Sequence, residues 1–142
     1  MIGYIDTSAA VPLLVAEPSS RACRRFWDDA DVVVSCRLLF VEAAAALASA
    51  QRLNRLGARA YASSVRRLDA LWEQMDIIEI DDALVRRAAG LTHRFGLRGY
   101  DAVHCASAEG LDDPMLVAAT GDHRLLDALQ RLGISTFDTN VA

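Results

Sequence analysis

The chain opens with the stretch Met1-Ile2-Gly3-Tyr4-Ile5-Asp6-Thr7-Ser8, a short apolar run that stops at an acidic residue. A run of this length and composition, bounded by a polar residue, predicts a β-strand over Ile2–Ile5. Because the run is apolar throughout, it fits a strand of a parallel sheet that is buried on both faces. Asp6 then follows the strand directly, at the edge where open parallel sheets bind their ligands.

Four more segments share these features and are predicted strands: Val32–Ser35, Ile77–Ile80, Met115–Ala119 and Ile134–Phe137. The patterns between them predict six helices: Ser19–Asp29, Leu38–Leu56, Ala58–Gln74, Asp82–Phe95, Tyr100–Glu109 and His123–Leu132. This alternation predicts an α/β fold, a three-layer α/β/α sandwich with a mainly parallel central sheet. Since no repeat, linker or low-complexity segment interrupts the pattern, we expect residues 1–142 to form a single domain.

Four acidic residues fall at or near the ligand-binding edge of this predicted sheet. Asp6 follows the first strand, Asp122 follows the fourth, Asp101 opens a helix after a glycine-bounded loop, and Glu42 lies in the first turns of the helix after the second strand. Each aspartate has an ordinary alternative role, as a turn residue or a helix cap for Asp6 and as an N-cap for Asp101 and Asp122. Four independent caps at successive strand ends are a less economical interpretation than one shared site.

Glu42 has the weakest structural alternative of the four. Its neighbours are the apolar residues 38–41 and the alanines 43–46, so no face of this helical stretch is otherwise polar. A carboxylate there is expected to be at least partly buried and therefore to need a partner or a metal ion. Arg37, five residues back, is a poor local partner on a helix.

A cluster of four carboxylates has a restricted chemistry. Two carboxylates about 4 Å apart repel each other by about 4 kcal/mol at an effective dielectric constant of about 20. Such a cluster persists only when protons or cations neutralise it. All-oxygen ligands favour Mg²⁺ or Mn²⁺, and the usual reaction at such sites is phosphodiester hydrolysis.

Composition excludes several classes of protein. With 142 residues, 53% of them hydrophobic, the chain can bury a packed core and is not disordered. All 15 basic residues are arginine, so no mechanism that needs a lysine is available. The net charge of −4 argues against a simple electrostatic nucleic-acid binder. Without the four proposed site acids, however, the other 15 acids face 15 arginines, so the acidity can belong mainly to the site.

The cysteines and the apolar runs bear on the compartment. Cys23, Cys36 and Cys105 are odd in number and widely spaced, which does not fit a disulfide framework and favours a reducing cytosol. Neither a signal peptide nor an apolar run of the roughly 18 residues that span a membrane is evident. We therefore expect a soluble, cytoplasmic protein without membrane contact.

These residues resemble the motifs of a known family. The segment Tyr4-Ile5-Asp6-Thr7-Ser8 is similar to the opening Asp-x-Ser of PIN-domain nucleases, and Glu42 in a long apolar helix matches their second acid. The segment Tyr100-Asp101-Ala102-Val103-His104-Cys105-Ala106 resembles the Tyr-Asp-Ala-x-His-x-Ala segment frequent in VapC toxins, and Thr120-Gly121-Asp122 resembles their Thr-x-Asp. The resemblance covers essentially the whole chain in order and spacing.

The resemblance implies a Mg²⁺-dependent endoribonuclease, with Mn²⁺ as a possible substitute, that acts as the toxin of a type II toxin–antitoxin pair. It assigns Asp6, Glu42, Asp101 and Asp122 as catalytic, metal-binding acids. It also implies an RNA substrate, a homodimer and a small inhibitory antitoxin. One departure is that no fifth acid closely follows Asp122, where some relatives have one, which makes a second metal less expected than the first.

The resemblance also suggests supporting groups. Ser8 and Thr120 match family polar positions that would orient the acids through hydrogen bonds. Arg98 and Arg124 could contact RNA phosphates, although a solvated surface is the common use of such residues. We favour a structural role for His104 over a role as a base, and packing at the helix start for Tyr100. The apolar residues that could line an antitoxin groove, which more commonly serve the core, are Val11, Leu13, Leu14, Leu38 and Leu39.

Two other functions stay open on the sequence alone. A PIN nuclease that serves RNA processing rather than toxicity would share the fold and the site. A phosphoacceptor or phosphatase domain would also place an aspartate after the first strand. Phosphoacceptor domains and these phosphatases both usually use a lysine, which this chain lacks. The phosphatases also have Asp-x-Asp where this chain has Asp6-Thr7-Ser8.

Overall fold

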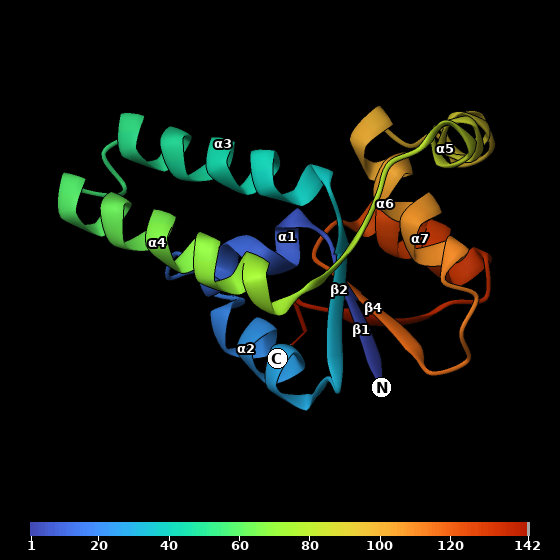
Figure 1. The fold of residues 1–142 in the computed structure, drawn as a ribbon, viewed down its shortest axis with the longest axis horizontal. Helices are drawn as coiled ribbons and strands as arrows, with labels where there is room; N and C mark the ends of the chain where they lie inside the picture. Colours follow the sequence, from blue (N-terminus) through green and yellow to red (C-terminus); the bar gives the residue numbers. More distant parts are fainter. Residues whose placement is uncertain (142) are drawn as a thin grey trace.

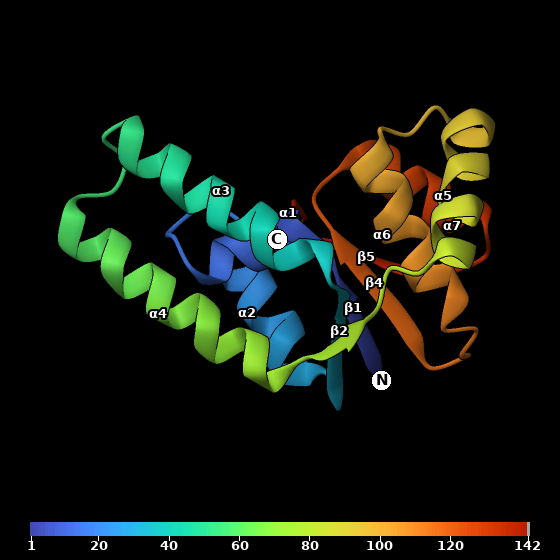
Figure 2. The same ribbon diagram turned by 45° about the horizontal axis from the view of Figure 1, so that its top comes forward.

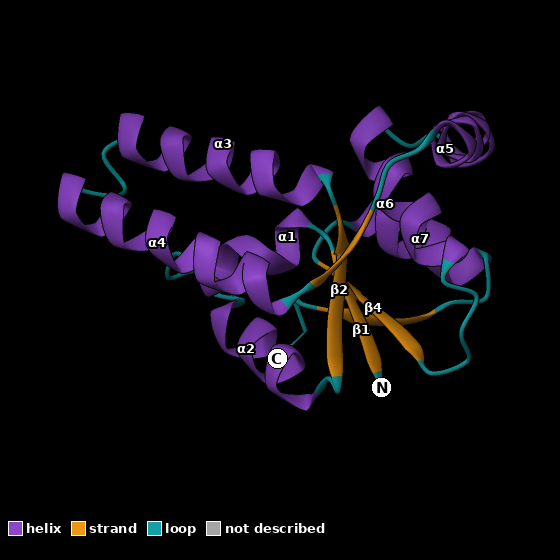
Figure 3. Ribbon diagram, viewed as in Figure 1, coloured by secondary structure: helices purple, strands orange, loops and turns teal. Residues whose placement is uncertain are grey.

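The computed structural model describes residues 1–141, which form a five-stranded sheet between two layers of helices (Figures 1 and 3). The strands are β1 (Ile2–Ile5), β2 (Val32–Cys36), β3 (Asp76–Ile78), β4 (Leu116–Thr120) and β5 (Ser135–Asp138). The first helical elements are α1 (Thr7–Ala10), the 3-10 turn η1 (Val11–Leu13), α2 (Ser20–Asp29), α3 (Leu38–Arg52) and α4 (Ala58–Gln74). The later helices are α5 (Asp82–Phe95), α6 (Gly99–Gly110) and α7 (His123–Arg131).

The strand order β3-β2-β1-β4-β5 explains where a site can form. All four strand pairings are parallel, and β1 pairs with β2 on one side and with β4 on the other. The chain therefore builds outward from β1 to β3 and then returns to β1 to build β4 and β5. The order of strands reverses between β1 and β4, and at such a switch point the loops diverge and leave a crevice at the carboxyl edge of the sheet.

Each face of the sheet has its own core. On one face, α1 to α4 pack through residues such as Leu39 and Leu47, which are completely buried (Figure 1). On the other face, α5 to α7 pack through residues such as Ala102 and Leu125. Figure 2 shows α3 and α4 running side by side as a hairpin beyond the edge of the sheet. The predicted three-layer α/β/α sandwich is confirmed, and its sheet is parallel throughout the described residues.

Most predicted elements are present, with shifts at their ends that have local causes. The helix predicted to reach Leu56 ends at Arg52, because the chain turns at Asn54, whose φ of 59° lies in the left-handed region. The third strand was predicted over Ile77–Ile80 and instead spans Asp76–Ile78. The short helix α1 and the turn η1 were not predicted, and they begin where Asp6 caps the chain after β1.

Of the apolar residues considered for an antitoxin groove, Leu13, Leu14 and Leu39 belong to the core.

Within residues 1–141, no helix is both long and apolar enough to cross a membrane.

Candidate functional site

The candidate site lies at the carboxyl ends of β1 and β4, where the strand order reverses. Asp6 comes directly after β1, and Thr120 is the last residue of β4. Two residues further on, Asp122 is the N-cap of α7. The parallel register of β1 with β4 brings these ends together, although they are more than 110 residues apart in sequence.

The Asp6 carboxylate accepts hydrogen bonds from three groups. Its Oδ1 accepts hydrogen bonds from the Ser8 hydroxyl at 2.7 Å and the Ala9 amide at 3.1 Å, and its Oδ2 accepts one from the Thr120 hydroxyl at 2.7 Å. The side chain is almost completely buried, and this burial raises the pKa of Asp6, although the nearby His104 and the hydroxyl donors act in the opposite direction. Ser8 and Thr120 therefore make the orienting hydrogen bonds that were expected of them, and Asp6 also serves as the helix cap that was its alternative role.

The turn from Thr120 to Asp122 is fixed by the same groups. The Gly121 amide donates to the Ser8 hydroxyl at 2.8 Å, and the Asp122 amide donates to the Thr120 hydroxyl at 3.0 Å. A Cβ atom at Gly121 would lie 2.8 Å from the Thr139 hydroxyl, so the close approach of this segment requires glycine. The Oδ1 of Asp122 accepts from the amides of Arg124 and Leu125, which is an N-cap, and leaves Oδ2 for another partner.

Glu42 has the partner that its apolar surroundings require. Its Oε1 accepts hydrogen bonds from the Thr7 hydroxyl at 2.6 Å and from Nε2 of His104 at 2.7 Å. Burial raises the pKa of Glu42, but the hydrogen bonds from His104 and Thr7 outweigh burial, and the pKa lies below its usual value. The cation that the local sequence of α3 does not supply therefore comes from α6.

His104 is buried and fully engaged. Its Nε2 faces Glu42, and its Nδ1 lies 2.8 Å from the Tyr4 hydroxyl and 3.6 Å from the sulfur of Cys36. Burial acts to lower the pKa of His104, but its contacts with Cys36 and Glu42 raise it to about 10. His104 is thus an imidazolium that donates to Glu42 and to Tyr4, which fits the structural role predicted for it rather than that of a base.

Arg98 joins the two remaining acids. Its Nε donates to Oδ2 of Asp101 at 2.9 Å, and its Nη2 donates to Oδ2 of Asp122 at 2.7 Å. Burial and the neighbouring Asp122 raise the pKa of Asp101, and the hydrogen bond from Arg98 opposes them. Tyr100 is 44% exposed, and its ring centroid lies 4.9 Å from Cζ of Arg98, the N-cap of α6. Its ring thus packs against a cation at the helix start.

The four acids belong to two hydrogen-bonded groups that meet where Asp6 and Thr7 are consecutive in the chain, together called the acidic network, and they do not form one ligand shell. Thr7, the residue after Asp6, donates a hydrogen bond to Glu42, and Ser8 accepts one from the Gly121 amide just after β4. Arg98 donates to both Asp101 and Asp122. Among residues 1–141, no three His, Cys, Asp or Glu side chains form a group arranged to hold a metal ion. Each carboxylate instead accepts hydrogen bonds from donors within the protein.

The network still offers oxygen atoms to a ligand. Both hydrogen bonds to Glu42 fall on Oε1, and the bond to Asp101 falls on Oδ2, so Oε2 and Oδ1 respectively accept none from the described residues. Since no fully buried side-chain oxygen or nitrogen of the described residues lacks a partner, these two oxygens are open to solvent. Such free carboxylate oxygens are the donors that a hard divalent cation requires.

Sequence reasoning did not identify Thr7 or the Glu42–His104 pair. Thr7 lies inside the Asp6-Thr7-Ser8 motif, and the sequence neighbour of His104 on its helix is Asp101 rather than Glu42. The available signal was the need for a cation near Glu42 in a chain with only three histidines, one of which lies in a strongly apolar helix. Arg124, considered for RNA contact, is exposed beside the Asp122 cap.

Replacing Thr120 with Val is expected to lower the free energy of unfolding by about 2 kcal/mol, because buried Oδ2 of Asp6 and the Asp122 amide both lose their partner. Urea unfolding in EDTA measures this change. The control is Thr136→Val on the neighbouring β5, where the hydroxyl meets only the exposed Gln130 side chain, and where we expect about 0.5 kcal/mol or less. Equal effects of the two substitutions would contradict the role assigned to Thr120.

The fold and the site together define a class: parallel α/β/α proteins with an acidic site at the β1–β4 switch point. Within that class, the PIN domain family matches residues 3–132, and the chain belongs to this family. It is similar to ribonuclease VapC45 of Mycobacterium tuberculosis, with 38% identity over 122 residues that cover 86% of this chain and 85% of that protein.

Two solved structures support the fold. The chain is similar to PAE2754 from Pyrobaculum aerophilum, with a TM-score of 0.74 and 21% identity over 99% of this chain and 90% of that one. It is also similar to VapBC-5 from Mycobacterium tuberculosis, a member of the VapBC family of toxin–antitoxin systems, with a TM-score of 0.65 and 17% identity over 96% of this chain and 98% of that one.

Proposed function

We propose that this protein is a divalent-metal-dependent endoribonuclease of the VapC type, the toxin of a toxin–antitoxin pair. The observation that carries the proposal is the acidic network, whose two adjoining hydrogen-bonded groups bring Asp6, Glu42, Asp101 and Asp122 to the switch point of a PIN-family sheet. The relation to ribonuclease VapC45 supplies the substrate class, RNA, and the reaction, hydrolysis of a phosphodiester bond.

The acids fit a divalent metal by donor type and by charge. All four supply hard carboxylate oxygens, and two of these oxygens are free of hydrogen bonds. The acidic network contains four carboxylates and two cations, His104 and Arg98, so its formal charge is −2. One divalent cation neutralises that charge, which supports one metal rather than two. Mg²⁺, or Mn²⁺ in its place, is the occupant we infer.

Asp6 and Asp101 are the residues we assign as direct ligands, since Oδ1 of Asp101 is free and Oδ2 of Asp6 accepts only one hydrogen bond, with Glu42 and Asp122 completing the acidic set. When bound, the metal would activate a water molecule and neutralise charge on the scissile phosphate. The chain's own contribution is positioning: Ser8 and Thr120 fix the orientation of Asp6, and Thr7 and His104 fix that of Glu42. The half-exposed Arg98 can turn from the carboxylates to a substrate phosphate without leaving the site.

We infer two protein partners from the relatives. VapBC-5, which shares this fold, belongs to a family of toxin–antitoxin systems, so we propose a small antitoxin for this chain as well. Homodimerisation is proposed on the same family resemblance. A short gene beside this one that encodes a DNA-binding protein would favour the toxin over a nuclease of RNA processing.

Incubation of the purified protein with total RNA tests the activity directly. We expect cleavage in the presence of Mg²⁺ or Mn²⁺, none in EDTA, and recovery when the metal is restored. Expression in a bacterial host without an antitoxin should arrest growth. Intact RNA under all metal conditions would contradict the proposed activity, and cleavage without growth arrest would favour a processing nuclease.

Arg98 should compete with the metal for Asp101 and Asp122. Replacing Arg98 with Ala is therefore expected to strengthen Mn²⁺ binding about fivefold, equivalent to about 1 kcal/mol, the scale of a half-exposed ion pair. Calorimetry in the absence of RNA measures the affinity. The matched control is Arg94→Ala, since Arg94 lies over the Phe95 ring and makes no ion pair with a described residue. Unchanged or weaker Mn²⁺ binding by the Arg98 variant would show that this cation does not oppose the metal.

A further inference from the structure

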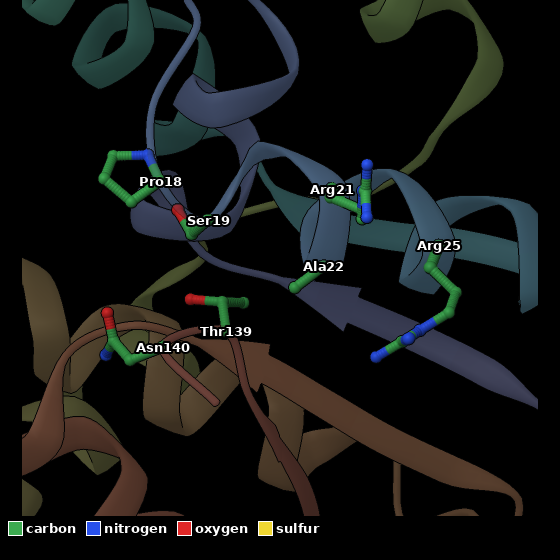
Figure 4. A pocket seen from close by; sticks show the side chains of 7 residues that line it. All are labelled: Pro18, Ser19, Arg21, Ala22, Arg25, Thr139 and Asn140. Carbon is green, nitrogen blue, oxygen red and sulfur yellow. The ribbon is translucent and has the colours of Figure 1, made fainter. Parts of the chain in front are cut away.

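A pocket beside the acidic network contains none of its four acids. It has a volume of about 500 Å³ and lies between the first turns of α2 and the segment after β5. Figure 4 shows Thr139 and Asn140 of the C-terminal segment opposite the start of α2, near Ser19, with Arg21 and Arg25 further along the helix. No acidic residue lines this pocket.

The two arginines are available for a ligand. Arg21 and Arg25 are exposed and lie four residues apart, one turn along the same helix, so they project on the same side. Neither makes an ion pair with any residue from 1 to 141, whereas Arg24 between them pairs with Asp28 at 3.5 Å. Two uncompensated guanidinium groups beside neutral hydrogen-bonding side chains form a surface that suits an anion.

The pocket is physically continuous with the acidic site. The Asn140 side chain donates to the carbonyl oxygen of Gly121 at 2.9 Å, and the Thr139 amide donates to the carbonyl oxygen of Thr120 at 3.1 Å. The wall of the pocket is therefore tied to the turn that carries Asp122.

We propose that this pocket is a backbone-phosphate subsite that holds single-stranded RNA to one side of the scissile bond. The proposal rests on the proposed ribonuclease function and adds the direction in which the substrate leaves the acidic network. Phosphate contacts of this kind position a strand without reading its bases. The pocket would therefore add affinity for long substrates of any sequence.

The experiment compares Arg21→Ala and Arg25→Ala, singly and as a double variant, with Arg24→Ala, which removes one arginine from the same helix outside the pocket. Binding of a labelled single-stranded RNA is measured by fluorescence anisotropy in EDTA, over a series of salt concentrations. We expect the double variant to bind about tenfold more weakly. The slope of log affinity against log salt concentration should become shallower by about 1.4, or about 0.7 for each lost phosphate contact. The Arg24 variant should stay close to the wild type.

Cleavage provides a second readout that a general loss of folding would not reproduce. With Mg²⁺, the double variant should cleave a very short oligonucleotide at the wild-type rate and a long RNA more slowly at low substrate concentration. Equal behaviour of the double variant and Arg24→Ala in both assays would overturn the subsite while leaving the ribonuclease intact. The subsite would also be overturned if the double variant bound RNA like the wild type but no longer bound polyglutamate. That result would identify a site for an acidic peptide. If the wild type neither binds nor cleaves RNA, the proposed function itself fails.

Discussion

Replacing Asp6 with Asn is expected to reduce metal-dependent RNA cleavage by about a thousandfold, equivalent to about 4 kcal/mol of transition-state stabilisation. Asp6 is the one acid of the network whose two oxygens are both fixed by hydroxyl donors, and no cation is paired with it directly. The amide has nearly the same shape as the carboxylate but carries no charge to offer a metal. The loss should therefore appear in the rate of the bound complex rather than in RNA affinity.

The control for this change is Asp127→Asn, the same substitution on the exposed side of α7, where Asp127 pairs with Arg131 at 3.7 Å. It should leave cleavage unaltered. Circular dichroism and urea unfolding establish that both variants fold, and Mn²⁺ titration should show weakened binding by Asp6→Asn alone. Wild-type cleavage by the Asp6 variant would remove Asp6 from the site and with it the proposed metal position.

The fold could be predicted from the sequence because its signals are local and repeated. Each strand is a short apolar run, and each long helix has a clear start or stop, such as the Asp81 cap and Gly96 of α5, with a φ of 67° at the glycine. The helix α1 escaped prediction because four residues are too few to show a period, and only the capping by Asp6 in the folded chain reveals it. The parallel order of strands follows from rules of connection, but the return from β3 to β4 beside β1 depends on packing that no local signal encodes.

The site could be predicted only in part for a related reason. Strand ends identify which acids meet at one edge. In the structure Arg98 donates to both Asp101 and Asp122, whereas Asp6 and Glu42 each have donors of their own. The identity of those donors depends on contacts between residues far apart in the chain. His104 lies 62 residues from Glu42, so helix periodicity could not pair them.

Replacing His104 with Gln is expected to lower the free energy of unfolding by about 3 kcal/mol near neutral pH, the typical cost of breaking a buried ion pair. Glutamine can still donate one hydrogen bond to Glu42, but it carries no charge, and it cannot also serve the Tyr4 hydroxyl and Cys36 as the imidazolium does. Tyr4 is buried in the core, so its unpaired hydroxyl adds to the loss. Urea unfolding, followed by tryptophan fluorescence in EDTA, measures the difference.

The pH dependence of that difference distinguishes an ion pair from simple packing. Because the pKa of His104 is raised to about 10 in the folded protein from 6.5, its contribution to stability is complete below about pH 6.5 and is lost as the pH rises toward 10. Because the pKa of Glu42 is lowered from 4.5, its contribution is complete above about pH 4.5 and is lost as the pH falls through its folded value. The difference between the wild type and the glutamine variant should therefore be greatest between these limits and shrink on either side. A difference that stays constant from pH 6 to 10 would assign His104 to packing alone.

Glu42→Gln tests the same pair from the other side and does not depend on the folding of the His104 variant. It leaves the imidazolium without its carboxylate, so the pKa of His104, followed by NMR of the ring, should fall from about 10. The double variant should be less destabilised than the sum of the single variants, because each single change already breaks the shared interaction. An unaltered pKa, or strictly additive losses, would mean that the two residues do not form the ion pair. Loss of the pair would free Glu42 to turn away from the acidic network, which is why we expect the positioning of this acid, and not only stability, to depend on His104.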